Sequence, residues 1–202
     1  MDKDLIRRAC CASVEKPQSE KQSSLTLSTV QQELEKQTPS AFLVKHNTDL
    51  GANLMKARWT PGRLLLRENA PTLHDVAKVY GEATALSWLN VQLLSVDSVL
   101  GAMAFGEEAL REGRQLIYAK CRSVPVVALA LFFGQYKAGE FAKEVEKIGG
   151  IQKVMVALGS YMRRAQDEAN KLIYEQELEQ EYKRRMSYAA NRCQNDNSAE
   201  VR

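Results

Sequence analysis

The sequence lacks long apolar runs. The longest, Val126–Phe133, has eight residues, whereas roughly 20 are needed for a helix to cross the hydrocarbon core of a bilayer. The N-terminal segment MDKDLIRRACCASVEK also lacks the apolar stretch of a secretory signal peptide. These two absences predict a cytoplasmic protein without a membrane partner.

Clusters of metal-binding or catalytic residue types are absent as well. The four cysteines contain no Cys-x-x-Cys pair, and the two histidines stand apart from them in sequence. The chain has no histidine pair, no nucleophile motif and no glycine-rich phosphate loop after a strand-like run. We therefore expect no metal, no cofactor and no enzymatic activity. The cysteines and histidines are Cys10, Cys11, Cys121, Cys193, His46 and His74.

What the chain does contain is enough apolar residues for one core. Of its 202 residues 45% are apolar and 26% are charged, with a net charge of +3, as in a single domain with polar ends. Helical spacing dominates, so we predict an all-α fold: a single compact helical domain of about five helices, a long C-terminal helix and disordered N- and C-terminal tails. The predicted parts are a tail (1–25), short helices and a basic connector (26–70), a helical core domain (71–168), a charged helical extension (169–188) and a second tail (189–202).

Capping residues mark the expected helix starts. Ser28 precedes a short amphipathic segment, and Thr72 with Asp75 three residues later resembles a capping box. Apolar residues three or four apart predict a longer helix over 82–100. A last helix is expected from Ile151.

The apolar run Val126–Phe133 is predicted to be the central helix of the domain. Ser123 as a cap, followed by Pro125 in the first turn, is typical of a helix start. No second strand-like run is present to pair with it as a strand. Because it is apolar on every side, the rest of the domain must cover it.

The segment KARWTPGRLLLR surrounds one tryptophan with basic residues and contains no acidic residue. Cationic groups neutralise phosphates and an exposed indole stacks on an unpaired base, so single-stranded DNA is the candidate partner. The alternative is a buried Trp59 with Leu64–Leu66 pinning a connector to the core, the basic residues being solvated only. The candidate nucleic-acid-binding residues are Lys56, Arg58, Trp59, Arg63 and Arg67.

The extension at 169–188 is charged, and its apolar positions are sparse. Glu179 with Lys183, and Glu181 with Arg185, stand at the i,i+4 spacing that supports a solvent-exposed helix. The apolar positions do not form a sustained heptad. A protein partner or a second copy of the chain is the candidate ligand of this helix.

Several short motifs lie between residues 71 and 168: Tyr80–Gly81, Trp88–Leu89, Gln92–Leu93, the residues Leu158, Tyr161 and Arg164, and a block comprising Leu131, Phe132, Phe133, Tyr136, Lys137 and Gly139. With these motifs, residues 71–168 resemble a family of small all-helical proteins encoded on bacterial mobile elements and phages. The family has no assigned activity, so the resemblance implies a genetic context rather than a reaction. The chain departs from the family after Gly139, where EFAKEVEKIGG replaces a small turn containing a Tyr-Gly pair and an aspartate.

Two functions are compatible with these patterns. The first is a non-enzymatic accessory protein of a mobile element or phage, such as a DNA-replication or helicase-loading adaptor. The second is a structural or regulatory protein–protein interaction module that uses the C-terminal helix. Within the family block, Lys137 and Gly139 either contact an anion or the backbone, or simply terminate the helix.

Overall fold

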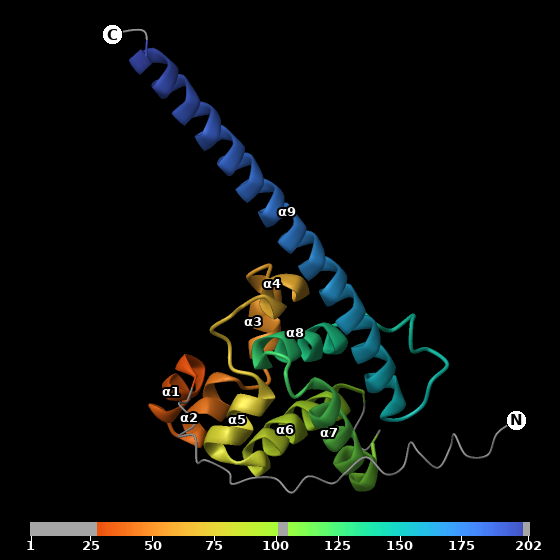
Figure 1. Ribbon diagram of the computed structural model, residues 1–202. Helices are drawn as coiled ribbons and strands as arrows, with labels where there is room; N and C mark the ends of the chain where they lie inside the picture. Colours follow the sequence, from red (N-terminus) through yellow and green to blue (C-terminus); the bar gives the residue numbers. More distant parts are fainter. Residues whose placement is uncertain (1–27, 101–104, 200–202) are drawn as a thin grey trace, which may run out of the picture.

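The computed structural model describes the backbone of residues 28–100 and 105–199, and the side chains in those ranges except Leu100 and residues 189–199. Within these ranges the chain forms helices joined by turns, and its single extended contact pairs Thr72 with Pro125. The predicted all-α fold with a long C-terminal helix is confirmed (Figure 1). The tail predicted at 1–25 lies outside the described residues. The helices are α1 (Thr29–Glu35), α2 (Pro39–Lys45), α3 (Leu50–Lys56), α4 (Pro61–Leu65), α5 (Leu73–Tyr80), α6 (Glu82–Leu100), α7 (Glu107–Cys121), α8 (Val126–Lys137) and α9 (Gln152–Ala199).

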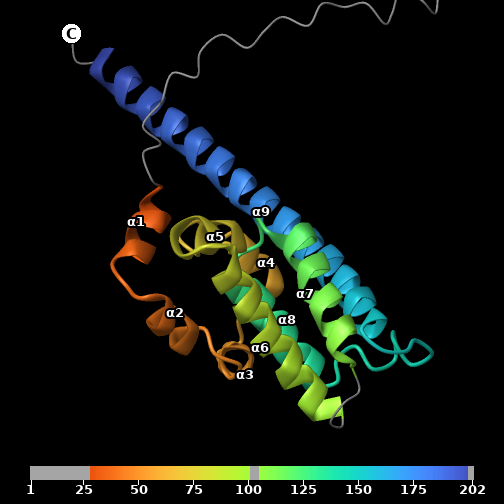
Figure 2. The ribbon, with the colours of Figure 1, turned by 90° about the horizontal axis from the view of Figure 1, so that it is seen from below.

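Helix α8 is the centre of the fold, as its apolar sequence predicted. Every residue from Val126 to Gly134 is buried, and α3, α4, α6 and α9 all pack against the helix. In the view of Figure 2, α8 lies behind α6. Its contact with α3 is a backbone-to-backbone approach, because a Cβ placed on Gly51 would lie 2.2 Å from the Ala130 carbonyl oxygen.

The predicted caps of α1 and α5 are confirmed, and they join the two helices. Ser28 and Gln31 form one capping box, and Thr72 and Asp75 form the other. Gln31 Nε2 donates to Asp75 Oδ1 at 2.8 Å, which links the boxes. Burial disfavours the ionised Asp75, but hydrogen bonds from Thr72 and Gln31 outweigh it and hold the pKa of this carboxyl below its usual value.

The predicted start of α8 needs a correction. Ser123 is not its cap: the helix begins at Val126, and Pro125 occupies the N-cap position without a side-chain hydrogen bond. The free amide at the start of α8 is satisfied elsewhere, since Val126 N donates to the Pro71 carbonyl at 2.8 Å. In return, His74 N in the first turn of α5 donates to the Arg122 carbonyl at 2.8 Å. The two helix starts therefore satisfy each other.

Helix α9 belongs to the core in its first part and leaves it in its second. Val154, Leu158, Tyr161, Ala165 and Ala169 are buried, whereas every described side chain from 173 to 188 is exposed. The helix continues beyond the boundary expected at 188, so the tail predicted for 189–202 is helical as far as Ala199. In the described part of the chain, no helix combines the length and the apolar content needed to cross a membrane.

Candidate nucleic-acid interface and protein-binding surfaces

The five candidate nucleic-acid-binding residues lie together where α3 turns into α4, and we call this surface the basic corner. Lys56 ends α3, Arg58 and Trp59 form the turn, Arg63 lies on α4, and Arg67 follows it. All five side chains are exposed, and Trp59 retains 40% of its accessible surface. Because Arg58 has a φ of 56°, the chain reverses sharply at this point.

The alternative interpretation of this segment is half right. Its predicted anchor exists, because Leu64 is completely buried and Leu65 packs against the core. Its prediction of a buried tryptophan is wrong, because the Trp59 indole is exposed. The leucines hold the turn down, and the tryptophan and the cations face solvent.

The cations of the basic corner have no ion-pair partner within the described ranges. This holds for Lys56, Arg58, Arg63 and Arg67. The Arg67 guanidinium lies 5.7 Å from the centroid of the Trp59 ring, a cation–π arrangement that orients the indole. The corner thus combines one oriented aromatic face with unpaired cations, which suits a flexible polyanion with unstacked bases.

Helix α4 is fixed in place by α9. Gly62 N donates to Glu168 Oε2 at 2.9 Å, and a Cβ on Gly62 would lie 2.7 Å from the Ala169 amide nitrogen. Only glycine permits this approach. The basic corner therefore sits beside the point at which α9 leaves the core (Figure 1).

The aromatic members of the family block are core residues. Phe132 packs against four rings: its centroid lies 5.1 Å from that of Phe133, 6.0 Å from Tyr136, 5.6 Å from Phe141 and 5.4 Å from Tyr161. Leu131 is completely buried beside them. These residues hold α8, the turn after it and α9 together.

The end of the family block ties α8 to its neighbours. Lys137 Nζ donates to the Thr48 carbonyl at 2.9 Å and to Ser95 Oγ at 3.0 Å, and burial lowers the pKa of this lysine. Gly139, at φ +82°, takes the left-handed conformation that ends the helix. Of the alternatives for these two residues, the structure shows a backbone contact for Lys137 and helix termination for Gly139.

The tryptophan and glutamine of the resemblance are also structural. Trp88 Nε1 donates to the His46 carbonyl at 2.6 Å, and Gln92 Nε2 reaches the same oxygen at 3.4 Å. His46 itself is buried, and this desolvation lowers its pKa. These bonds fasten the end of α2 to α6.

The exposed part of α9 from 173 to 188, which we call the arm, carries both ion pairs and apolar side chains. Glu179 pairs with Lys183 at 2.7 Å, and Glu181 pairs with Arg185, as the i,i+4 spacing predicted. Six large apolar side chains on the arm are exposed, and no other part of the described chain covers them. They are Ile173, Tyr174, Leu178, Tyr182, Met186 and Tyr188.

The sequence reasoning missed a groove between α6 and α7. It has a volume of about 590 Å³ and is lined by residues of both helices. Its sequence signals were the exposed apolar positions of α6, which interrupt the polar face expected of a surface helix, and the charged run EEALREGR of α7. The lining residues are Asn90, Leu94, Glu107, Glu108, Leu110, Arg111 and Arg114.

Among the described residues, no group of three or more His, Cys, Asp or Glu side chains is arranged to hold a metal ion. Cys121 is buried, and desolvation raises the pKa of its thiol to about 11, so it is a poor nucleophile at neutral pH.

Comparison with family models, with curated proteins and with solved structures gives no match to this chain.

Proposed function

We propose that this protein is a non-enzymatic accessory protein of a bacterial mobile element or phage that binds single-stranded DNA at the basic corner. The observation that carries the proposal is the exposure of Trp59 among cations that have no ion pair within the described residues. Its exposed indole offers a face on which an unpaired base can stack. A DNA-replication or helicase-loading adaptor is the role for which such a surface is suited.

The test is fluorescence anisotropy of a labelled oligothymidylate over a range of salt concentrations. The triple variant Lys56→Ala, Arg58→Ala and Arg63→Ala should bind at least about tenfold more weakly, and the salt slope should fall by about 2, since each phosphate contact contributes about 0.7. Trp59→Ala should weaken binding by roughly five- to 150-fold, the range of one stacked base. Its salt slope should stay at the wild-type value.

A matched control removes three exposed lysines elsewhere on the molecule, Lys120, Lys143 and Lys147. This variant has the same net charge as the triple variant but keeps the basic corner. Its affinity should remain close to wild type. Absence of binding at low salt, or equal losses in the two triple variants, would refute the proposal.

The arm supports a second function, that of a protein–protein interaction module. An isolated helix with this many uncovered apolar side chains is typical of an element that a partner covers. Truncation should remove the partner without unfolding the domain. The cut belongs after Ile173, because a cut near Gln166 would also remove Glu168 and Ala169, which hold α4.

Affinity purification of the full-length and truncated chains from the native host tests this function. We expect at least one protein to be retained by the full chain and lost on truncation after Ile173. Circular dichroism and thermal unfolding check that the truncated domain remains folded. A partner set that is unchanged by the truncation would exclude the arm as a binding element.

A further inference from the structure

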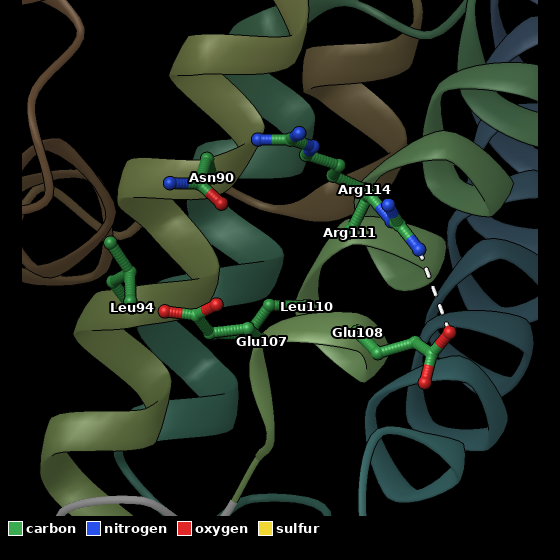
Figure 3. Close-up of a pocket in the computed structure, with 7 residues that line it drawn as sticks. All are labelled: Asn90, Leu94, Glu107, Glu108, Leu110, Arg111 and Arg114. Carbon is green, nitrogen blue, oxygen red and sulfur yellow. Dashed lines mark ion pairs between the residues drawn. The ribbon is translucent and has the colours of Figure 1, made fainter.

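The groove between α6 and α7 has a positively charged residue, Arg114, at one end and a negatively charged residue, Glu107, at the other. Figure 3 shows Arg114 reaching from α7 toward α6 beside Asn90, with Glu107 at the other end near Leu94. Arg111 and Glu108 neutralise each other at 3.5 Å. Glu107 and Arg114 have no ion pair within the described residues. They stand seven positions apart on α7, and therefore on the same face, about 10.5 Å apart along the axis.

Arg114 is the member of this pair that most needs a partner. Its Nε is buried from solvent and has no hydrogen-bond acceptor in the described structure. An atom with so little accessible surface is not reached from outside, so a ligand in the groove would pair with the rest of the guanidinium, which has no ion pair within the described residues. A carboxylate is the natural choice, because it accepts two parallel hydrogen bonds from a guanidinium.

The rim of the groove is apolar and uncovered. Leu94 lines the groove and is 45% exposed, and Val91, about one turn earlier on α6, is 47% exposed. A partner that fits must therefore present apolar side chains next to its carboxylate. An amphipathic helix laid into a two-helix groove does this.

The arm of a second copy has the required pattern. Tyr174, Leu178 and Tyr182 follow each other at i,i+4 spacing on one side of it. Glu177 and Arg184 flank this side, and neither has an ion pair within the described residues. They too stand seven positions apart, or about 10.5 Å along the axis. Antiparallel to α7, the arm would thus set Glu177 against Arg114 and Arg184 against Glu107.

A pairing of two arms is less well supported. A stripe at strict i,i+4 spacing turns by about 40° at each step, because 3.6 residues make one turn, and so it leaves the face that a coiled coil of 3.5-residue period requires. Over a groove only a few turns long this drift is harmless. Pairing of the arms also leaves Arg114 without an acceptor.

We propose that the groove between α6 and α7 binds the arm of a second copy of the chain, antiparallel to α7, through the pairs Arg114 with Glu177 and Glu107 with Arg184. The proposal rests on the function proposed above for the arm. Each copy offers one arm and one groove, so the full-length protein should self-associate.

Sedimentation velocity of the full chain over a range of concentrations tests this. The wild type should dimerise, and Arg114→Glu and Glu177→Arg should each weaken the dimer at least about tenfold. The double variant, Arg114→Glu with Glu177→Arg, restores opposite charges and should return to within about threefold of wild type. Lys120→Glu, an equal charge reversal on α7 outside the groove, should leave dimerisation unchanged.

Three results would overturn the proposal. A monomeric wild type would exclude a second copy as the occupant. A dimer weakened by Glu177→Arg but not by Arg114→Glu would assign the contact to two arms. A double variant no better than the single variants would show that the two residues do not meet. Each leaves the arm's function open, since partner loss on truncation after Ile173 is a separate measurement.

Discussion

Replacing Gly134 with alanine should destabilise the protein although alanine is the better helix former. A Cβ at this position would lie 2.6 Å from the Gly51 carbonyl carbon and 2.9 Å from its Cα. Both are backbone atoms, which cannot rotate away. An overpacking cost of about 3 kcal/mol, less a helix-propensity gain of about 1 kcal/mol, predicts a net loss of about 2 kcal/mol. For a chain of this length the melting temperature should fall by about 4–8 °C.

Urea unfolding followed by circular dichroism measures the effect, and Gly159→Ala is the matched control. Gly159 also lies within a helix, but nothing approaches its added Cβ within 4 Å. This variant should therefore gain about 0.5–1 kcal/mol from propensity alone. If Gly134→Ala were as stable as the control, α3 and α8 could not be in backbone contact, and the position of the basic corner at the end of α3 would have to be reconsidered.

Three further predictions concern single side chains. Lys137→Met should cost about 1–3 kcal/mol in urea unfolding, because it leaves the Thr48 carbonyl without its donor. The lowered pKa of Asp75 stabilises the fold fully above the unfolded-state pKa of about 3.9, and this contribution is lost as the pH falls through the folded-state pKa. Stability measured against pH should accordingly show a smaller acid loss in Asp75→Asn than in wild type. Cys121, whose thiol has a pKa raised to about 11, should react with iodoacetamide at pH 8 far more slowly in the folded protein than in urea, as mass spectrometry of the peptide containing it would show.

Local sequence signals predicted the helices well where the capping partners are close in the chain. Ser28 with Gln31 and Thr72 with Asp75 lie three residues apart, so their bonds follow from the sequence alone. The start of α8 was misjudged because its amide bonds to Pro71, far away in the chain. The Pro71 carbonyl takes the place of a capping side chain near Val126 in sequence. A contact between residues so far apart leaves no pattern in the local sequence.

The candidate site was predictable in its residues but not in its exposure. The cations around Trp59 are visible in the sequence, yet whether the indole faces solvent depends on α9, which fixes α4 through Gly62. The groove at Arg114 was missed for the same reason. The groove, and the lack of an acceptor for Arg114 Nε among the described residues, arise only when α6 and α7 pack together. The sequence of either helix alone does not reveal them.

The continuity of α9 has a mechanical consequence. From residue 170 to Ala199 the helix extends for about 45 Å at 1.5 Å per residue, without a proline or glycine to act as a hinge. This exposed part begins next to the hydrogen bond between Gly62 and Glu168. A tilt of about 5° at that contact displaces the far end by about 4 Å over this length. The same contact ties α9 to α4, and so to the turn that carries Trp59.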